Sequence, residues 1–433
     1  MKPTEIRTLY SIYKNTAGVF TDTRKPLQNG LFFALSGPNF NANSFAHKAL
    51  SLGAKAAVVD DKVLAQENEN FFWVENSLQS LQDLARFHRK QLSTTIVGLT
   101  GSNGKTTTKE LMSSVLQTHF KTVATKGNLN NHIGVPLSLL AIDPETEIAV
   151  IEMGANHQGE IATLCDIASP DLGYITNFGK AHLEGFGGIE GIIKGKTELY
   201  RFLEKNKGTI LCNADDPTQL EHTQNLQSKC YTFGCNETVD FSIKYDTSKT
   251  LTVHTENGVI QSELYGNYNL TNIGAAAALG NYFKIPFKKI QTGIATYKAT
   301  QNRSETRKLG TNMVILDAYN ANPTSMKHAL NSFFDQFLTN RVLILGDMLE
   351  LGAYSAVEHQ NIVNLIQQQV DCQSFLVGKV FAKTKFETTQ IQSFETIQLL
   401  GNWLKENEFH NKNILIKGSR GLALEDVLAY LKV

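Results

Sequence analysis

The sequence predicts an α/β protein of three domains: a small N-terminal α/β domain, a central domain with a parallel sheet, and a C-terminal α/β domain. Two observations predict this class. The chain has 433 residues, about three times the length of a common domain. Short apolar strands alternate with helical patterns along most of it, which is typical of parallel sheets covered by helices.

The N-terminal domain is expected to cover residues 1–93. Its strands are predicted at residues 31–35 and 56–59, with a helical pattern at 46–52 between them, because apolar runs of this length fit buried strands. A further helix is expected at residues 78–89.

The central domain is expected to cover residues 94–304. Its strands are predicted at residues 96–99, 148–151, 172–176 and 209–212. Shorter strands between residues 231 and 254 predict an extra small sheet, and the run of alanines at 275–279 predicts an apolar helix.

The C-terminal domain, residues 305–433, is expected to be Rossmann-like, with a polar hinge at 300–308 before it. Its strands are predicted at residues 313–316, 341–345, 374–377 and 413–416, each followed by a helical pattern. Asn322 and Pro323 are typical of a helix start, since asparagine caps helices well and proline fits the first turn.

Charge and composition narrow the function classes. Lysines plus arginines and aspartates plus glutamates each number 41, giving a net charge of zero, so no global basic footprint for nucleic acid exists. No apolar run approaches the ~20 residues that span a bilayer. The chain lacks a signal-peptide pattern, and its five cysteines contain no Cys-x-x-Cys pair. We expect a cytoplasmic monomer without stable membrane insertion.

A glycine-rich loop joins the strand at 96–99 to a helix. Glycines admit backbone N–H groups close to phosphate, Lys105 supplies a positive charge, and the Thr106 hydroxyl can bind Mg²⁺. The usual spacing would place the first glycine at Leu99, whereas Gly98 comes one residue early. The expected nucleotide-binding residues are Thr100, Gly101, Ser102, Asn103, Gly104, Lys105, Thr106 and Thr107.

Two further polar residues follow strand ends. Glu152 comes directly after an apolar strand, where a carboxylate can reach phosphate-bound Mg²⁺. His182 lies in a glycine-containing segment after the strand at 172–176 and could bind a metal. Each also has an ordinary interpretation, as a strand-end carboxylate and as a polar loop residue.

Ordered motifs from about Thr21 to the C-terminus resemble the Mur ligase family of peptidoglycan synthesis. Beside the variant phosphate loop, they are Gly127–Pro136, Glu152–Gly154, His182–Glu184, Asn213–Pro217, Gly266–Asn272, Asp317–Pro323, Gly346–Gly352 and Lys417–Arg420. The resemblance implies an N-terminal domain that binds a UDP-linked substrate and a central P-loop domain that binds ATP. It also implies a C-terminal domain that contacts the nucleotide and the amine substrate.

The resemblance implies ATP-dependent amide formation through an acyl phosphate, with two Mg²⁺ ions. Thr106 and Glu152 would bind the first ion. His182 and a carbamylated Lys196 would bind the second, since carbamylation turns an ammonium into a carboxylate; Lys194 is a competing register. The implied catalytic set is Lys105, Glu152, His182 and Lys196.

The resemblance also assigns nucleotide contacts outside the phosphate loop. Asn269 and Asn272 would contact adenine, although helix capping also explains them. Arg303 would reach a phosphate and Asp317 the ribose, and both would act when the domains close.

The implied substrates are UDP-MurNAc-tripeptide and D-Ala-D-Ala, because the last motifs resemble the branch of the family that adds this dipeptide. The expected substrate-binding residues are Asp22, Thr23, Arg24, Asn130, Asn131, Asn320, Asn322, Lys417, Ser419 and Arg420. Ser419 and Arg420 also fit a helix cap and a surface ion pair. The stretch Asn41–Ser44 departs from the more acidic pattern of relatives.

Three alternatives remain. A sibling ligase that adds a diamino acid usually carries an Asp-Asn-Pro-Arg element, which this sequence lacks. Folylpolyglutamate synthetase shares the fold but typically lacks the third-domain motifs. A nucleotide-gated binding module without ligase activity would need one Mg²⁺ rather than the second metal set of Glu152, His182 and Lys196.

Overall fold

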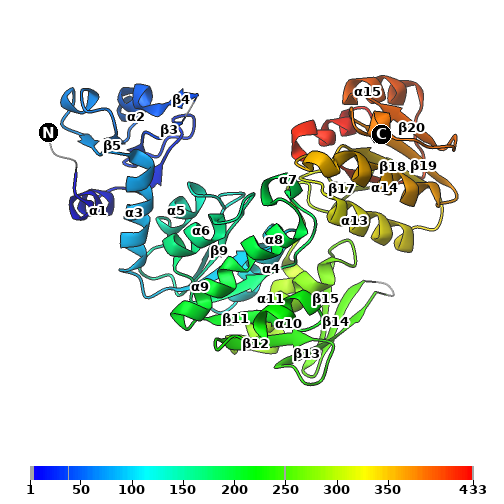
Figure 1. Ribbon diagram of the computed structural model, residues 1–433, viewed down its shortest axis with the longest axis horizontal. Coiled ribbons are helices and arrows are strands. Elements are labelled where there is room, and N and C mark those ends of the chain that lie inside the picture. Colours follow the sequence, from blue (N-terminus) through cyan, green and yellow to red (C-terminus); the bar gives the residue numbers. More distant parts are fainter. Residues whose placement is uncertain (1–3, 38, 248–249, 432–433) are drawn as a thin grey trace.

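The structure, a computed structural model, describes residues 4–37, 39–247 and 250–431. The chain forms three α/β domains, each built around its own main sheet (Figure 1). The central domain lies between the other two, so the N-terminal and C-terminal domains stand at opposite ends of the molecule's long axis. Among the described residues, no helix is long and apolar enough to cross a membrane.

The N-terminal domain has a parallel sheet in the order β1-β2-β5-β6 and a small β3-β4 hairpin. Its elements are α1 (Ile6–Lys14), β1 (Val19–Phe20), β2 (Leu31–Phe33), β3 (Ser36–Gly37), β4 (Phe40–Asn41), α2 (Ala46–Ser51), β5 (Ala56–Val59), β6 (Phe71–Trp73) and α3 (Ser77–Arg89). Strand β5 is apolar at every position and fully buried, as expected of a parallel strand covered on both faces.

Helix α3 joins the N-terminal domain to the central one. Its start is capped by Asn76, whose side chain accepts a hydrogen bond from the helix backbone. Near its end, Arg86 and Arg89 form ion pairs of 2.8 Å with Asp166 and Asp171 of the central domain. Tyr13 of α1 adds a hydrogen bond of 2.8 Å to the Leu140 carbonyl oxygen, so both helices anchor the N-terminal domain.

The central domain has nine strands in the order β15-β14-β13-β12-β11-β10-β7-β9-β8. The strands are β7 (Thr95–Thr100), β8 (Thr122–Ala124), β9 (Ile148–Glu152), β10 (Leu172–Ile175), β11 (Thr209–Asn213), β12 (Lys229–Gly234), β13 (Phe241–Asp246), β14 (Leu251–Thr255) and β15 (Gly258–Ser262). The extra small sheet is the antiparallel group β13–β15, which joins the parallel part through two residue pairs between β12 and β13.

Helices cover this sheet, and α11 is the apolar helix expected around residues 275–279. The helices are α4 (Lys105–Gln117), α5 (Gly134–Leu139), α6 (Glu160–Ala168), α7 (Leu183–Phe186), α8 (Ile189–Lys196), α9 (Glu198–Asn206), α10 (Pro217–Thr223), α11 (Asn269–Tyr282) and α12 (Phe287–Thr296). Strand β7 lies between β9 and β10, so the loop after β7 is flanked by the carboxyl ends of both neighbours. This topology positions the site.

The C-terminal domain has six strands in the order β16-β17-β21-β18-β19-β20, parallel except for the edge strand β16. The elements are β16 (Glu305–Leu309), β17 (Asn312–Asp317), α13 (Pro323–Gln336), β18 (Arg341–Gly346), α14 (Ser355–Gln367), β19 (Cys372–Val377), β20 (Ile391–Phe394), α15 (Ile397–Glu406) and β21 (Asn413–Lys417). Asn322 caps α13 in a capping box, and Pro323 opens the helix, as predicted.

Two local predictions for this domain are wrong. The polar stretch 300–308 is not all hinge, because β16 begins at Glu305 and pairs antiparallel with β17. Between β21 and residue 431, the last one described, the chain forms the short 3₁₀ helices Arg420–Leu422 and Leu424–Ala429 rather than an α-helix. Lys417, Ser419 and Arg420 therefore do not lie at the start of an α-helix.

Candidate active site

The loop between β7 and α4 requires glycine at two positions. Gly101 has φ 137° and Gly104 has φ 78°; a Cβ would lie 2.0 Å from Thr176 Oγ1 at the first and 2.7 Å from Asn272 Oδ1 at the second. Gly98 has another role. It lies inside β7 at ordinary φ, where a Cβ would approach a methyl carbon of Met153 to 2.7 Å. The early glycine therefore serves strand packing rather than phosphate binding.

Polar atoms of this loop lack partners. Within the described residues, Thr100 Oγ1, Ser102 Oγ and Asn103 Nδ2 are buried without a hydrogen bond. The Lys105 ammonium folds back to donate to the carbonyl oxygens of Gly101, at 2.7 Å, and Ser102, at 3.3 Å. Because unpaired buried polar atoms cost free energy, the loop is suited to an anion that would satisfy them.

The electrostatic surroundings of Lys105 also favour a bound anion. Burial lowers the pKa of its ammonium; the Glu152 carboxylate opposes this lowering, and the Arg303 guanidinium adds to it. A bound phosphate would supply negative charge beside both cations and would therefore favour the charged form of the lysine.

Glu152 and Thr106 lie together as a candidate pair of metal ligands. Glu152 ends β9 and is 1% exposed, and its two carboxylate oxygens lie 3.0 and 3.3 Å from the Thr106 hydroxyl. Asn130 Nδ2 donates to the same carboxylate at 2.8 Å and thereby orients it. Mg²⁺ in nucleotide sites uses one or two carboxylates together with phosphates and water, so this pair fits the ion. Within residues 4–37, 39–247 and 250–431, no three His, Cys, Asp or Glu side chains are grouped to hold a metal alone.

His182 and Lys196, expected at the second metal, are engaged otherwise. His182 Nδ1 pairs with the Glu350 carboxylate of the C-terminal domain. Lys196 is 1% exposed, donates to the Ala155 carbonyl oxygen at 3.2 Å and lies 5.0 Å from the centre of the Phe186 ring. Burial, with a smaller contribution from the charge of Lys105, holds the pKa of Lys196 well below its usual value.

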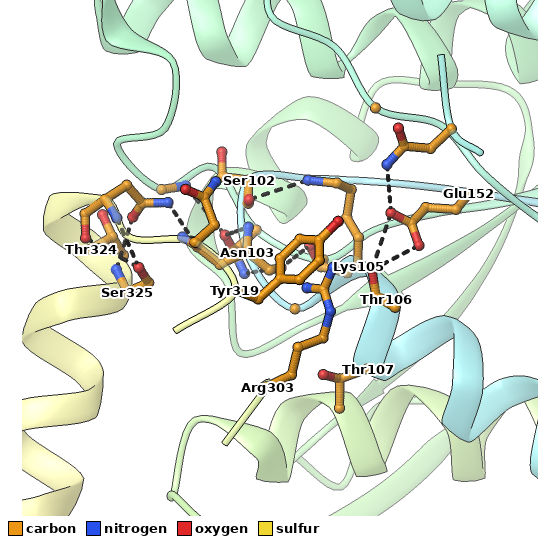
Figure 2. A pocket seen from close by; sticks show the side chains of 18 of the residues that line it. Ser102, Asn103, Lys105, Thr106, Thr107, Glu152, Arg303, Tyr319, Thr324 and Ser325 are labelled. Atoms are coloured by element: carbon orange, nitrogen blue, oxygen red, sulfur yellow. Dashed lines mark hydrogen bonds between the residues drawn. The ribbon is translucent and has the colours of Figure 1, made fainter. Parts of the chain in front are cut away.

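A cavity of about 840 Å³ opens between the central and C-terminal domains. Seventeen of the expected site residues line it: Ser102, Asn103, Gly104, Lys105, Thr106, Thr107, Asn130, Asn131, Glu152, His182, Asn269, Asn272, Arg303, Asp317, Asn320, Asn322 and Lys417. The structure does not place eight others on its wall: Asp22, Thr23, Arg24, Thr100, Gly101, Lys196, Ser419 and Arg420. Figure 2 shows part of this cavity, with Glu152 beside Thr106 and Lys105 and with Arg303 under the Tyr319 ring.

The two asparagines expected to contact adenine are hydrogen-bonded to each other. Asn272 Nδ2 donates to Asn269 Oδ1 at 2.8 Å, and Asn269 Nδ2 donates to the Tyr265 carbonyl oxygen at 2.7 Å. Asn272 Oδ1 also accepts from the Thr108 hydroxyl at 3.0 Å. The start of α11 is thereby fixed against α4 beside the phosphate loop.

Contacts across the cavity join the two domains. Asn322 Nδ2 donates to Asn103 Oδ1 at 2.7 Å, which ties the cap of α13 to the phosphate loop. Lys180 pairs with Glu358 at 2.7 Å, and its backbone N–H donates to Thr324 Oγ1 at 2.9 Å. The C-terminal domain is therefore docked on the phosphate site.

The motif after β21 differs from the expected anion site. Lys417 Nζ pairs with the Asp317 carboxylate at 2.6 Å and is 2% exposed, so its charge is already neutralised. The Ser419 hydroxyl is buried, accepting from the Leu349 N–H at 3.0 Å and donating to the Ala321 carbonyl oxygen at 3.3 Å. Arg420 is exposed, and its Nη1 donates a hydrogen bond of 3.1 Å to the Tyr319 hydroxyl.

The N-terminal residues lie apart from the cavity. Asp22 and Arg24 form an exposed ion pair of 2.9 Å, in which hydrogen bonds from Arg24 lower the pKa of Asp22 to about 2. Asn131 lines the cavity, and its side chain accepts a hydrogen bond of 2.9 Å from the backbone N–H of Gly134, the first residue of α5.

Thr176 and Asn177, which follow β10, also contact the phosphate loop, although neither was among the expected site residues. The Thr176 hydroxyl donates to the Asn103 carbonyl oxygen at 2.6 Å, and the Asn177 side chain both accepts from the Asn103 N–H and donates to its carbonyl oxygen, each at 3.1 Å. The signal was present, because polar residues that follow a buried strand beside β7 must face the phosphate loop.

The fold and this site define a phosphate-loop enzyme of three α/β domains. Residues 99–280 match the Mur ligase middle domain and residues 302–420 match the Mur ligase, glutamate ligase domain. The chain belongs to the Mur ligase family.

Curated relatives named UDP-N-acetylmuramoyl-tripeptide--D-alanyl-D-alanine ligase match nearly the whole chain. The protein of Bacillus subtilis (strain 168) is 36% identical, covering 95% of this chain and 92% of its own length. That of Escherichia coli (strain K12) is also 36% identical, covering 96% and 93%.

Solved structures of ligases with similar names have the same fold as this chain. A crystal structure of MurF from Acinetobacter baumannii has a TM-score of 0.86 and 29% identity, covering 99% of this chain and 98% of that one. MurF ligase from Thermotoga maritima in complex with ADP has a TM-score of 0.82 and 26% identity, covering 96% and 97%. Folylpolyglutamate synthase from Mycobacterium tuberculosis, at 14% identity and a TM-score of 0.61, shares the fold alone.

Proposed function

We propose that this chain is an ATP-dependent amide ligase that joins D-Ala-D-Ala to UDP-MurNAc-tripeptide, giving UDP-MurNAc-pentapeptide, ADP and phosphate. One observation carries the proposal: the phosphate loop and the C-terminal Asn320 and Asn322 line a single cavity. ATP and an acceptor amine can therefore meet there. The names of the full-length relatives support the choice of substrates.

The chemistry runs in two steps. A carboxylate oxygen of the tripeptide attacks the γ-phosphorus of ATP, and ADP leaves. The amine of D-Ala-D-Ala then attacks the carbonyl carbon, phosphate leaves with that oxygen, and the amine loses a proton. Both steps concentrate negative charge on phosphoryl oxygens, which Lys105 and Arg303 on the cavity wall would stabilise.

Thr106 and Glu152 would hold one Mg²⁺, which neutralises phosphate charge when bound. We assign a second Mg²⁺ to His182 and to Lys196 in carbamylated form. A ligating histidine commonly gives its other ring nitrogen to a carboxylate, and Glu350 occupies Nδ1 of His182 in this way. The lowered pKa of Lys196 favours the neutral amine, which is the form that reacts with carbon dioxide.

The remaining contacts complete the proposal. Asn269 and Asn272 would face adenine, Asp317 the ribose, and Arg420 the dipeptide carboxylate. Residues 1–93 would bind the UDP end at Asp22–Arg24, residues 94–304 would bind ATP, and residues 305–433 would contact the nucleotide and the amine. We further propose that the enzyme acts as a monomer.

Phosphate release and product mass test the proposal. With ATP, Mg²⁺, D-Ala-D-Ala and a UDP-MurNAc-tripeptide ending in diaminopimelate or lysine, phosphate should appear together with UDP-MurNAc-pentapeptide. Leaving out either substrate should return release to background. Release equally fast with a diamino acid and a UDP-dipeptide would favour the sibling ligase, and binding of ATP without release would favour the binding module.

A further inference from the structure

Tyr319 lies between two arginine guanidinium groups just after β17. The Arg303 guanidinium carbon lies 3.5 Å from the centre of the ring, and that of Arg420 lies 5.1 Å away. Arg420 Nη1 also donates a hydrogen bond of 3.1 Å to the Tyr319 hydroxyl. The backbone N–H of Tyr319 donates to the Asn302 carbonyl oxygen at 3.1 Å, which fixes the ring beside the hinge.

The ring face holds Arg303. Its guanidinium is in van der Waals contact with the ring, and across the described part of the chain its Nε is buried without a hydrogen-bond partner. Stacking on an aromatic face orients a guanidinium plane while leaving its N–H groups free. Figure 2 shows Arg303 beneath the Tyr319 ring, on the side of the cavity that carries Lys105 and Thr107.

Tyr319 also lines a second cavity. This cavity holds about 270 Å³ and is lined by Tyr319, Arg420 and Glu425, together with Asn128 and Gln301. Tyr319 and Asn128 also line the large cavity. Tyr319 therefore forms part of the wall between the phosphate site and the space beside Arg420.

We propose that Tyr319 is a positioning residue for the ligation reaction: its ring sets Arg303 toward the ATP phosphates, and its hydroxyl sets Arg420 toward the carboxylate of the incoming dipeptide. The inference rests on the proposed function, which assigns those ligands to the two arginines. One side chain thus fixes two cations that act on different substrates.

Two substitutions separate the two contacts. Tyr319→Phe keeps the ring and removes the hydroxyl, so the KM for D-Ala-D-Ala should rise about threefold to tenfold while the KM for ATP stays within about twofold. Tyr319→Leu also removes the stack, so the dissociation constant of ADP should rise about threefold to thirtyfold. Steady-state kinetics measures the first effect, and calorimetric titration with Mg²⁺ and ADP measures the second.

Tyr430→Phe is the matched control. Tyr430 also donates a hydroxyl hydrogen bond of 3.1 Å, to Gln398, and has a cation, Lys405, 5.4 Å from its ring centre. It lies outside both cavities, so this variant should keep wild-type values of both KM constants.

The outcomes distinguish this inference from the proposed function. Absence of wild-type turnover would contradict the proposed function, whereas the ADP titration of Tyr319→Leu would still test the stack. Two results with a catalytically active wild type would overturn the inference. One is unchanged KM values in Tyr319→Phe, and the other is a fall in kcat alone in both variants.

Discussion

Replacing Glu152 with glutamine should remove the magnesium dependence of nucleotide binding. The substitution keeps the shape of the side chain and an oxygen that can accept the 2.8 Å hydrogen bond from Asn130. It removes the negative charge beside the Thr106 hydroxyl at a position that is 1% exposed. Two unit charges about 4 Å apart interact by about 4 kcal/mol at an effective dielectric constant of about 20, which corresponds to about a thousandfold.

Calorimetric titration of ADP with and without Mg²⁺ measures this effect. The wild type should bind ADP more tightly with Mg²⁺, Glu152→Gln should lose most of that gain, and its ligation rate should fall about a hundredfold or more. Glu160→Gln is the control, because Glu160 lines the same cavity but is exposed. A Glu152→Gln protein that retained the full effect of Mg²⁺ would refute the assignment of Glu152 as metal ligand.

Three further substitutions test other parts of the site. Lys196→Met should abolish ligation but keep ADP binding. Because burial lowers the pKa of Lys196, the unfolded chain binds more protons than the folded chain at every pH between that lowered pKa and about 10.4. In this pH range, urea unfolding should show a wild-type stability that rises with pH and a flatter profile for the variant. Gly104→Ala should lower the free energy of unfolding by about 1–2 kcal/mol and weaken ADP binding, whereas Gly187→Ala, at a similar φ of 75° with open space around it, should cost stability alone; equal ADP binding in both would contradict the clash. Lys180→Met should weaken domain docking by about 1 kcal/mol and so lower kcat/KM about fivefold. The double variant with Glu358→Gln should have a kcat/KM no lower than that of either single variant, and additive losses would contradict direct pairing.

The sequence predicted the buried strands well and the edge strands poorly. Strand β5 and strand β9 are buried on both faces, so every residue had to be apolar until the final Glu152, and such runs are visible in the sequence. Strand β16 lies at an edge with no fully buried residue. Its polar side chains therefore matched a hinge as well as a strand.

The phosphate site was predictable because its parts are local. The phosphate loop depends on adjacent residues between a strand and a helix. The carboxylate of Glu152 depends only on the end of a neighbouring strand and on the order of the sheet. The Lys417–Asp317 pair was not predictable, since it joins residues a hundred positions apart. It neutralises the positive charge by which Lys417 was expected to bind an anionic substrate group. The role of Tyr319 depends likewise on three segments that meet only in the fold.

Transfer of an oxygen isotope tests the central claim most directly. If ATP activates the tripeptide as an acyl phosphate, a UDP-MurNAc-tripeptide with ¹⁸O at both oxygens of its terminal carboxylate should give one ¹⁸O atom in each phosphate released with D-Ala-D-Ala present, as read by mass spectrometry. Phosphate released without ¹⁸O during pentapeptide formation would contradict an acyl phosphate and the proposed use of ATP.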